Sequence, residues 1–164
     1  MTVTAVRKDP QALSLTLEAE FDASPERVWQ LWSDPRQLER WWGPPTYPAT
    51  FTKHELEPGG RVEYHMTGPE GDQPHAYWEV QEVHPPNSLV VRDGFANEDG
   101  SPDTEMPTNE IRVTIEDAGA GRTRMSIVSI FPSTEAMEQV LGLGMEEGLT
   151  LAVGQIDEIL AENA

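Results

Sequence analysis

Residues 21–45, FDASPERVWQLWSDPRQLERWWGPP, constrain the fold of this chain most, because they hold four of its five tryptophans. Ser24-Pro25 and Asp34-Pro35 each place a favourable N-cap before a proline at the first helical position. A Gly-Pro-Pro sequence then ends the second helix. Helices this short are unstable alone. Their aromatic faces must therefore pack against a larger element.

Much of the remaining chain alternates apolar and polar residues, a pattern typical of half-buried strands. Turn-forming Gly, Pro and Asn residues separate the alternating segments. The sequence predicts strands at residues 13–21, 50–56, 61–66, 75–84, 88–93, 111–115 and 125–131. Residues 1–10 are expected to form a flexible tail.

The chain from about Ser133 onward repeats apolar residues three or four positions apart, which predicts one long helix. Gly142, Gly144, Gly148 and Gly154 are each unfavourable there by about 1 kcal/mol relative to alanine. On a buried helix face, these glycines would let a sheet approach closely. They would also leave space that a side chain would otherwise fill.

This order of elements predicts an α+β fold in which an antiparallel sheet curls around the C-terminal helix. We expect about six or seven strands in this sheet, and the two short helices follow the first of them. A chain of 164 residues fits one domain, which we expect to span residues 11–164.

The charge balance excludes several classes of partner. The net charge is -18, from 29 acidic and 11 basic residues, whereas nucleic acids and anionic membranes bind basic surfaces. No segment is apolar and long enough to span a bilayer, and the N-terminus lacks the apolar core of a signal peptide. We therefore expect a cytoplasmic protein that binds neither nucleic acid nor membrane. The absence of cysteine excludes disulfides, thiolate metal sites and cysteine nucleophiles.

Motifs for catalysis and cofactor binding are absent: the sequence has no GxSxG, HExxH or P-loop pattern. We therefore expect no cofactor and assign no catalytic residue. A metal site needs three or four ligands at matched distances, so we interpret the histidines as ordinary surface or rim residues. These are His54, His65, His75 and His84, about one per predicted strand.

Two pairs of adjacent charged residues are also interpreted as ordinary surface residues. Glu146 and Glu147 would point about 100° apart on a helix and cannot form a carboxylate pair by themselves. Arg92 and Asp93 lie near the end of a predicted strand. We interpret all four as solvated side chains, although Arg92 can pair with a carboxylate-bearing ligand.

Aromatic and methionine residues form the more promising set, because they come from elements that converge between the sheet and the helix. Each residue alone is explained by core packing, but the set is consistent with a ligand cavity, since Trp and Tyr add polar groups to an apolar wall and Met adapts to varied shapes. The residues expected to line it are Trp41, Trp42, Tyr64, Met66, Trp78, Val80, Phe95, Met125, Ile127, Met145, Gly148 and Leu149.

Four motifs in order carry a family resemblance over nearly the whole chain. They are residues 21–45, PGG at 58–60, EVHPP at 82–86 with LV at 89–90, and MEEG at 145–148. The chain resembles the START-like (SRPBCC, helix-grip) superfamily, and within it the bacterial homologues of the activator of the heat-shock-protein-ninety ATPase, the AHSA-type domain. The resemblance implies a sheet gripping a long helix, with a hydrophobic cavity between them.

Relatives in this superfamily bind lipids, sterols or polyketide-like molecules in that cavity, and some are cyclases or hydrolases. The family often has Gly-Trp where this chain has Gly148-Leu149. Exchanging the indole for an isobutyl group is expected to enlarge or reshape the cavity. The acidic, turn-rich segment at residues 96–105 is a candidate lid over it.

Three functions follow as hypotheses. The first is a small protein that binds a hydrophobic small molecule, with polar groups such as the Trp indoles, Tyr64 and Arg92 setting its orientation. The second is a co-chaperone-like module that acts on a heat-shock ATPase, as the family name suggests. The third is a cyclase or hydrolase of an aromatic polyketide, for which Glu146, His54 and Tyr64 are the nominees. The oligomeric state is open in each.

Overall fold

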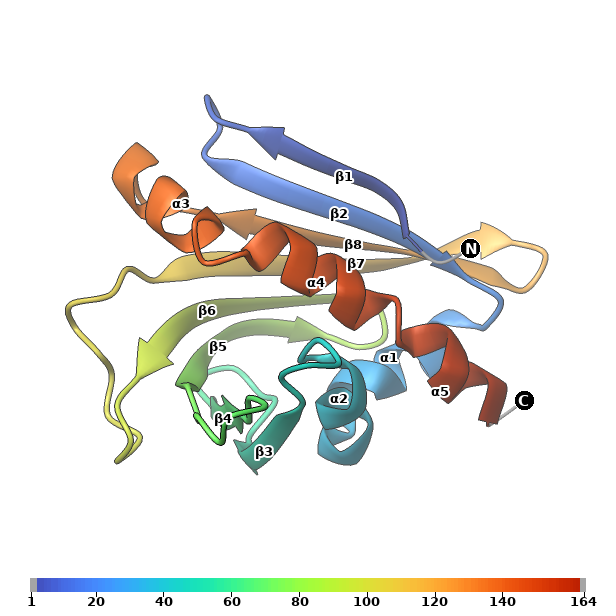
Figure 1. Ribbon diagram of the computed structural model, residues 1–164. Helices are drawn as coiled ribbons and strands as arrows, with labels where there is room; N and C mark the ends of the chain where they lie inside the picture. The colour runs from blue at the N-terminus through green and yellow to red at the C-terminus, as the bar shows by residue number, and fades with distance from the viewer. Residues whose placement is uncertain (1–2, 163–164) are drawn as a thin grey trace.

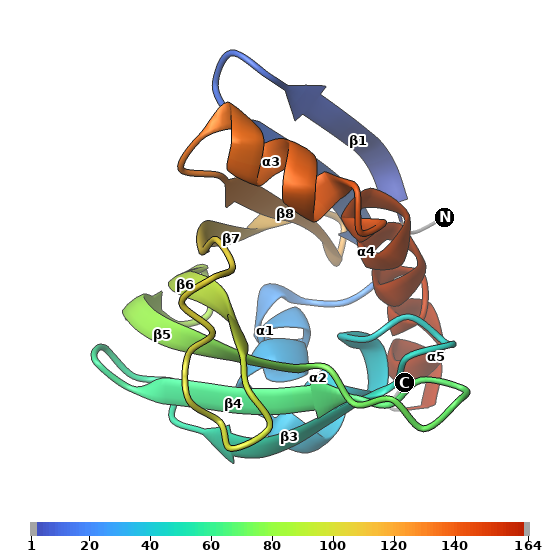
Figure 2. The same cartoon turned by 60° about the vertical axis from the view of Figure 1, so that its left-hand side comes forward.

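Eight antiparallel strands form one sheet in the computed structural model, which describes residues 3–162. The strands are β1 (Val3–Asp9), β2 (Ser14–Phe21), β3 (Ala49–His54), β4 (Arg61–Met66), β5 (His75–His84), β6 (Ser88–Ala96), β7 (Asn109–Gly119) and β8 (Arg122–Ile130). Their order across the sheet is β1-β2-β8-β7-β6-β5-β4-β3. The α+β fold that the sequence predicts is thus confirmed, with a curved sheet and C-terminal helices along its open side (Figures 1 and 2).

β1 occupies most of the segment predicted as a tail at residues 1–10, so that prediction is wrong for residues 3–9. The strand pairs with β2 and covers an edge that would otherwise be open. Val3 and Val6 are half-buried against the core. The other side chains of β1 are mostly exposed, which explains why no alternation marks the strand in the sequence. Residues 1–2 of the predicted tail lie outside the described part of the chain.

The two tryptophan-rich helices, α1 (Pro25–Ser33) and α2 (Pro35–Trp41), begin at the predicted caps. The Ser24 hydroxyl accepts a hydrogen bond of 3.2 Å from a first-turn backbone N–H, and Asp34 accepts one of 2.9 Å at the start of α2. These bonds satisfy backbone donors that have no partner within a helix. Both helices bury their aromatic side chains in one apolar cluster with residues of the sheet.

The C-terminal region is helical as predicted, but it forms three helices instead of one long helix. They are α3 (Thr134–Leu141), α4 (Met145–Val153) and α5 (Ile156–Glu162). Gly142 ends α3, Gly154 ends α4, and Gly144 between the first two has a φ of +88°. Glycine adopts this left-handed conformation without steric cost, so it lets the chain change direction there. None of the helices within residues 3–162 is long and apolar enough to cross a membrane.

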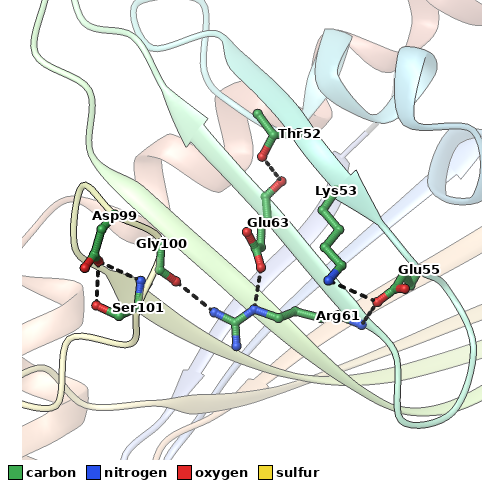
Figure 3. Close-up of polar contacts among 8 residues, drawn as sticks. All are labelled: Thr52, Lys53, Glu55, Arg61, Glu63, Asp99, Gly100 and Ser101. Carbon is green, nitrogen blue, oxygen red and sulfur yellow. Dashed lines mark hydrogen bonds and ion pairs between the residues drawn. The ribbon is translucent and has the colours of Figure 1, made fainter.

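The segment between β6 and β7 is attached to the outer face of the sheet (Figure 3). Arg61 lies on that face, because Val62 and Tyr64 of β4 are buried on the inner face and successive residues of a strand point to opposite sides. Its guanidinium donates hydrogen bonds to Glu63 at 2.7 Å and to the carbonyl of Gly100 at 3.0 Å. The side chain of Asp99 accepts bonds from the backbone and hydroxyl of Ser101. This part of the segment is therefore folded against β4.

Candidate functional site

A cavity of about 340 Å³ lies between the concave face of the sheet, the junction of α3 with α4, and the segment that follows α2. Buried apolar side chains form two clusters, and both contribute to its wall. Trp42 and Tyr64 belong to the larger cluster, which includes the tryptophans of α1 and α2, whereas Val140 belongs to the smaller one. The cavity therefore separates two parts of the core.

Eight of the twelve residues that the sequence suggests for the cavity wall do line it. They are Trp42, Tyr64, Met66, Phe95, Ile127, Met145, Gly148 and Leu149. They come from β4, β6 and β8, from α4 and from the end of α2, so the sheet and the C-terminal helices face each other across the space. A Cβ built on Gly148 would meet no atom within 4 Å, so this glycine borders open space.

The other four predicted residues are packed in the core and are absent from the cavity wall: Trp41, Trp78, Val80 and Met125. The Trp41 indole donates to the carbonyl of Leu31 at 3.0 Å, and Met125 accepts a hydrogen bond from the Trp32 indole at 3.3 Å. Trp42 packs against Trp78 with ring centroids 5.0 Å apart, and it is Trp42 that reaches the cavity. Sequence periodicity assigns a residue to the inner face of the sheet, but it does not show whether the side chain reaches the cavity or packs behind the cavity wall.

Three polar side chains, Asp93, Asn109 and Ser129, also line the cavity and are named here the polar row. Asp93 on β6 pairs directly with Asn109 on β7, so their side chains share the inner face. Ser129 on β8 pairs with Ile111, which lies two residues from Asn109 on the same face of β7. The register of three adjacent strands thus gathers the row on one side of an otherwise apolar space.

Asp93 is the ionisable residue of the polar row, and its interpretation as a solvated side chain is wrong. It is half-buried, and the Tyr64 hydroxyl donates a hydrogen bond of 3.3 Å to its Oδ1. Burial raises the pKa of Asp93 from 3.8 to about 7, because a charged carboxylate is poorly solvated there. The Tyr64 bond and the nearby Trp78 indole, which makes no well-formed hydrogen bond, oppose this rise.

Tyr64 itself is held in the neutral form. Its burial, together with the Asp93 charge, raises the pKa of the phenol well above its usual value of 10.0. The hydroxyl therefore keeps its proton, which it donates to Asp93. Its ring stacks on Phe51 with centroids 4.8 Å apart, and this contact fixes its orientation.

Several buried donors around the cavity have no hydrogen-bond partner among residues 3–162. They are Asn109 Nδ2, Ser129 Oγ and the indole nitrogen of Trp42. Asn109 and Ser129 are only 5% and 0% exposed. Buried polar groups in proteins are nearly always paired, so unpaired donors on a cavity wall indicate a partner that enters the cavity. Strand patterning alone does not find these residues, because Asn109 and Ser129 occupy positions where an apolar side chain is expected.

The α3–α4 junction, and not the acidic loop, borders the cavity at its open side. Leu143 and Gly144 line it there, and Leu143 is 64% exposed. Tyr47 also lines the cavity and donates a hydrogen bond of 2.8 Å to Asp72, which joins two loops. No residue at positions 96–105 is part of the wall, so the expectation that this segment forms a lid is not supported.

Two of the three nominated acid–base residues are engaged elsewhere. The imidazole Nε2 of His54 lies 3.0 Å from the carbonyl of Trp32, and Glu146 forms an ion pair of 3.2 Å with Lys8. Tyr64 alone lines the cavity. Arg92 is exposed on the strand face opposite Asp93 and is not part of the wall, so it cannot orient a ligand there.

The histidines do not assemble a metal centre. His65 and His75 are cross-strand partners with ring centroids 5.2 Å apart. Burial, and then the neighbouring His75, lower the pKa of His65. In the described part of the chain, no group of three or more His, Asp or Glu side chains is arranged to hold a metal ion.

Comparison with known proteins agrees with this architecture. The family described as Activator of Hsp90 ATPase homolog 1-like protein matches residues 22–161. A search of curated proteins gives no match. The crystal structure of protein Ms6760 from Mycobacterium smegmatis is 47% identical, with a TM-score of 0.89 over 96% of each chain.

Two further solved structures have the same fold. The solution NMR structure of a protein from Arthrobacter aurescens is 48% identical, with a TM-score of 0.93 over 98% of this chain and 93% of that one. The AHSA1 protein from Silicibacter pomeroyi is 25% identical, with a TM-score of 0.73 over 92% of this chain and 99% of that one.

Proposed function

The chain belongs to the family of Activator of Hsp90 ATPase homolog 1-like proteins, and we propose that it binds a hydrophobic small molecule in the cavity between its sheet and C-terminal helices. The observation that carries this proposal is the combination of an apolar wall with unpaired buried donors in one cavity. Small-molecule sites commonly have this composition, in which apolar contacts supply affinity and a few polar groups fix orientation.

The dimensions of the cavity favour a compact ligand. Its volume of about 340 Å³ is near the lower end of the roughly 300–1,000 Å³ typical of such sites. Burial of apolar surface contributes about 25 cal/mol for each Å² removed from water, before the costs of association. Among lipids, sterols and aromatic polyketide-like molecules, this size favours those of one or two rings or a short chain.

The name of the family suggests a second hypothesis, a module that acts on a heat-shock ATPase. The exposed surface is strongly acidic, and such a surface can meet a basic partner. No contact within the described residues favours this function over ligand binding, so we treat it as the alternative that the next experiment addresses. An enzymatic role, as a cyclase or hydrolase, would act in the same cavity and presupposes ligand binding.

Thermal unfolding against a panel of fatty acids, sterols, flavonoids and aromatic ketones tests the proposal, and the cavity volume predicts the largest effect from the smaller members. A ligand present at a hundred times its Kd adds about 2.7 kcal/mol to stability. For a domain of this size that is a rise in Tm of roughly 5–10 °C. A flat response to the whole panel, together with altered ATP turnover when the protein is added to a purified heat-shock ATPase, would favour the alternative.

A further inference from the structure

We infer that the polar row selects hydrophobic molecules whose polar end is an uncharged oxygen, a carbonyl or a hydroxyl, and rejects those that end in a carboxylate. This inference rests on the proposed function, because it names the chemistry of the ligand that the cavity takes. It follows from which donors are unpaired, which charges are present and where the strands place them.

The unpaired groups of the cavity can each donate a hydrogen bond, and the Ser129 hydroxyl can also accept one. Asn109 Nδ2 and Ser129 Oγ belong to adjacent strands and face the same space, and neither donates to a described residue. The Trp42 indole, which lies beside the Tyr64 hydroxyl without a well-formed hydrogen bond to it, is a third donor on the wall. A buried donor without an acceptor is costly, so a ligand that brings an acceptor oxygen gains more here than a hydrocarbon does. Carbonyl and hydroxyl oxygens are both acceptors.

The charges of the cavity act against an anionic ligand. Its wall contains no Lys, Arg or His within the described residues, so a carboxylate would find no cation. The ionisable side chains on the wall are Asp93, Tyr64 and Tyr47. A ligand carboxylate bound at the polar row would lie next to Asp93, and two like charges in a poorly solvated site cannot both remain ionised without a large penalty.

Charged groups on the opposite face of the sheet do not compensate. Glu79 and Arg92 are cross-strand partners on β5 and β6, but each alternates with residues that face inward. Arg61 is engaged with Glu63 and the loop on the outer face. The charge that a ligand meets from inside the cavity is therefore that of Asp93.

The protonation of Asp93 adds a dependence on pH. Burial raises the pKa of its carboxyl group to about 7, so it is mostly neutral at pH 6 and mostly charged at pH 8. The neutral acid repels an anion less and donates a hydrogen bond of its own. The rejection of carboxylates should therefore be strongest at pH 8 and weaker at pH 6.

Four probes with one ring system test the inference by isothermal titration calorimetry: 2-acetylnaphthalene, 2-naphthoic acid, 2-ethylnaphthalene and 2-naphthylmethylamine. At pH 8 the ketone should bind about tenfold or more tightly than the acid, and several-fold more tightly than the hydrocarbon. Asp93→Asn should reduce the preference for the ketone over the acid and make it independent of pH between 6 and 8. Ser129→Ala should weaken the binding of the ketone and leave the affinity for the hydrocarbon unchanged.

Glu79→Gln is the matched control, because it removes one carboxylate from the outer face of the sheet beside the same strand. Circular dichroism and Tm of each variant establish that it is folded before titration. If the hydrocarbon and the acid bind as tightly as the ketone, the inference is overturned while ligand binding stands. Preferential binding of the amine would also overturn it. If no probe binds, the proposed function fails for compact aromatic ligands and the inference fails with it.

Discussion

The Tyr64 hydroxyl donates a hydrogen bond of 3.3 Å to Asp93 across a strand that separates them. Tyr64 is on β4 and Asp93 on β6, and β5 lies between these two strands in the sheet. The β5 residue that pairs with Tyr64 is Ala76, whose small side chain leaves the path across the sheet open. The bond joins the aromatic wall of the cavity to its polar row.

Asp93→Asn should stabilise the protein at pH 8 and have little effect near pH 4. Burial raises the pKa of Asp93 from 3.8 to about 7, so the folded protein retains a proton that the unfolded chain releases. The stabilisation from this proton is complete below about pH 4 and is lost as the pH rises through about 7. Asparagine should remove a loss on the order of 4 kcal/mol between these limits.

Urea unfolding of the wild type and of Asp93→Asn at pH 4, 6 and 8 measures this difference. Glu79→Gln again provides the control, since it changes the net charge equally on an exposed face. A constant difference between Asp93→Asn and the wild type at all three values would show that Asp93 does not titrate in this range.

Met125→Ala should destabilise the protein more than Met66→Ala does. Met125 is fully buried and accepts a hydrogen bond from Trp32, so its truncation creates a new void and costs about 2–5 kcal/mol. Met66 is half-buried and borders a cavity that already exists, so its loss adds space without creating a separate void. Chemical denaturation of the two variants makes the comparison, and equal losses would contradict the division between core and cavity wall.

Two substitutions of Gly148 test different properties, the stability of α4 and the space in the cavity. Gly148→Ala should stabilise α4 by about 0.5–1 kcal/mol, because its Cβ meets no atom within 4 Å and alanine favours helices. Gly148→Leu should fill the cavity and weaken ligand binding. Gly144→Ala is the control for the backbone, because a φ of +88° should make it destabilising by roughly 1–2 kcal/mol. Thermal unfolding measures all three, and a destabilised Gly148→Ala would show that the site is not open.

Arg61→Ala should release the acidic loop without changing ligand affinity. The guanidinium holds the carbonyl of Gly100 at 3.0 Å and stacks over the Tyr77 ring at 4.5 Å, both on the outer face of the sheet. Limited proteolysis should cut residues 97–105 faster in the variant. If affinity for a cavity ligand fell as well, the loop would have a role at the cavity that the wild-type contacts do not indicate.

Much of the fold can be predicted from the sequence, because strong local signals specify it. The caps at Ser24 and Asp34 start the two short helices, and alternation marks seven of the eight strands. β1 is missed because only Val3 and Val6 turn toward the core. The breaks in the C-terminal helix are missed because apolar spacing continues through Gly142 and Gly144, whose backbone angles the spacing does not encode.

The candidate site is predicted less completely, and the reason differs for each part. Aromatic and methionine residues on converging elements indicate the apolar wall, yet Trp78 and Met125 prove to lie behind it. The polar row depends on the register of three strands, which aligns Asp93 with Asn109. Sequence spacing does not give that register. Residues 97–108 connect β6 to β7, and no turn pattern in them shows which residues of the two strands pair.

The most direct test of the central claim is the ligand-induced change in Tm for Leu149→Trp beside Leu151→Trp. Leu149 lines the cavity, whereas Leu151 on the same helix is 57% exposed and points away from it. For a panel ligand that raises the Tm of the wild type, the account predicts that Leu149→Trp loses most of the rise and Leu151→Trp keeps it. An undiminished rise in Leu149→Trp would contradict the claim that the ligand binds in this cavity.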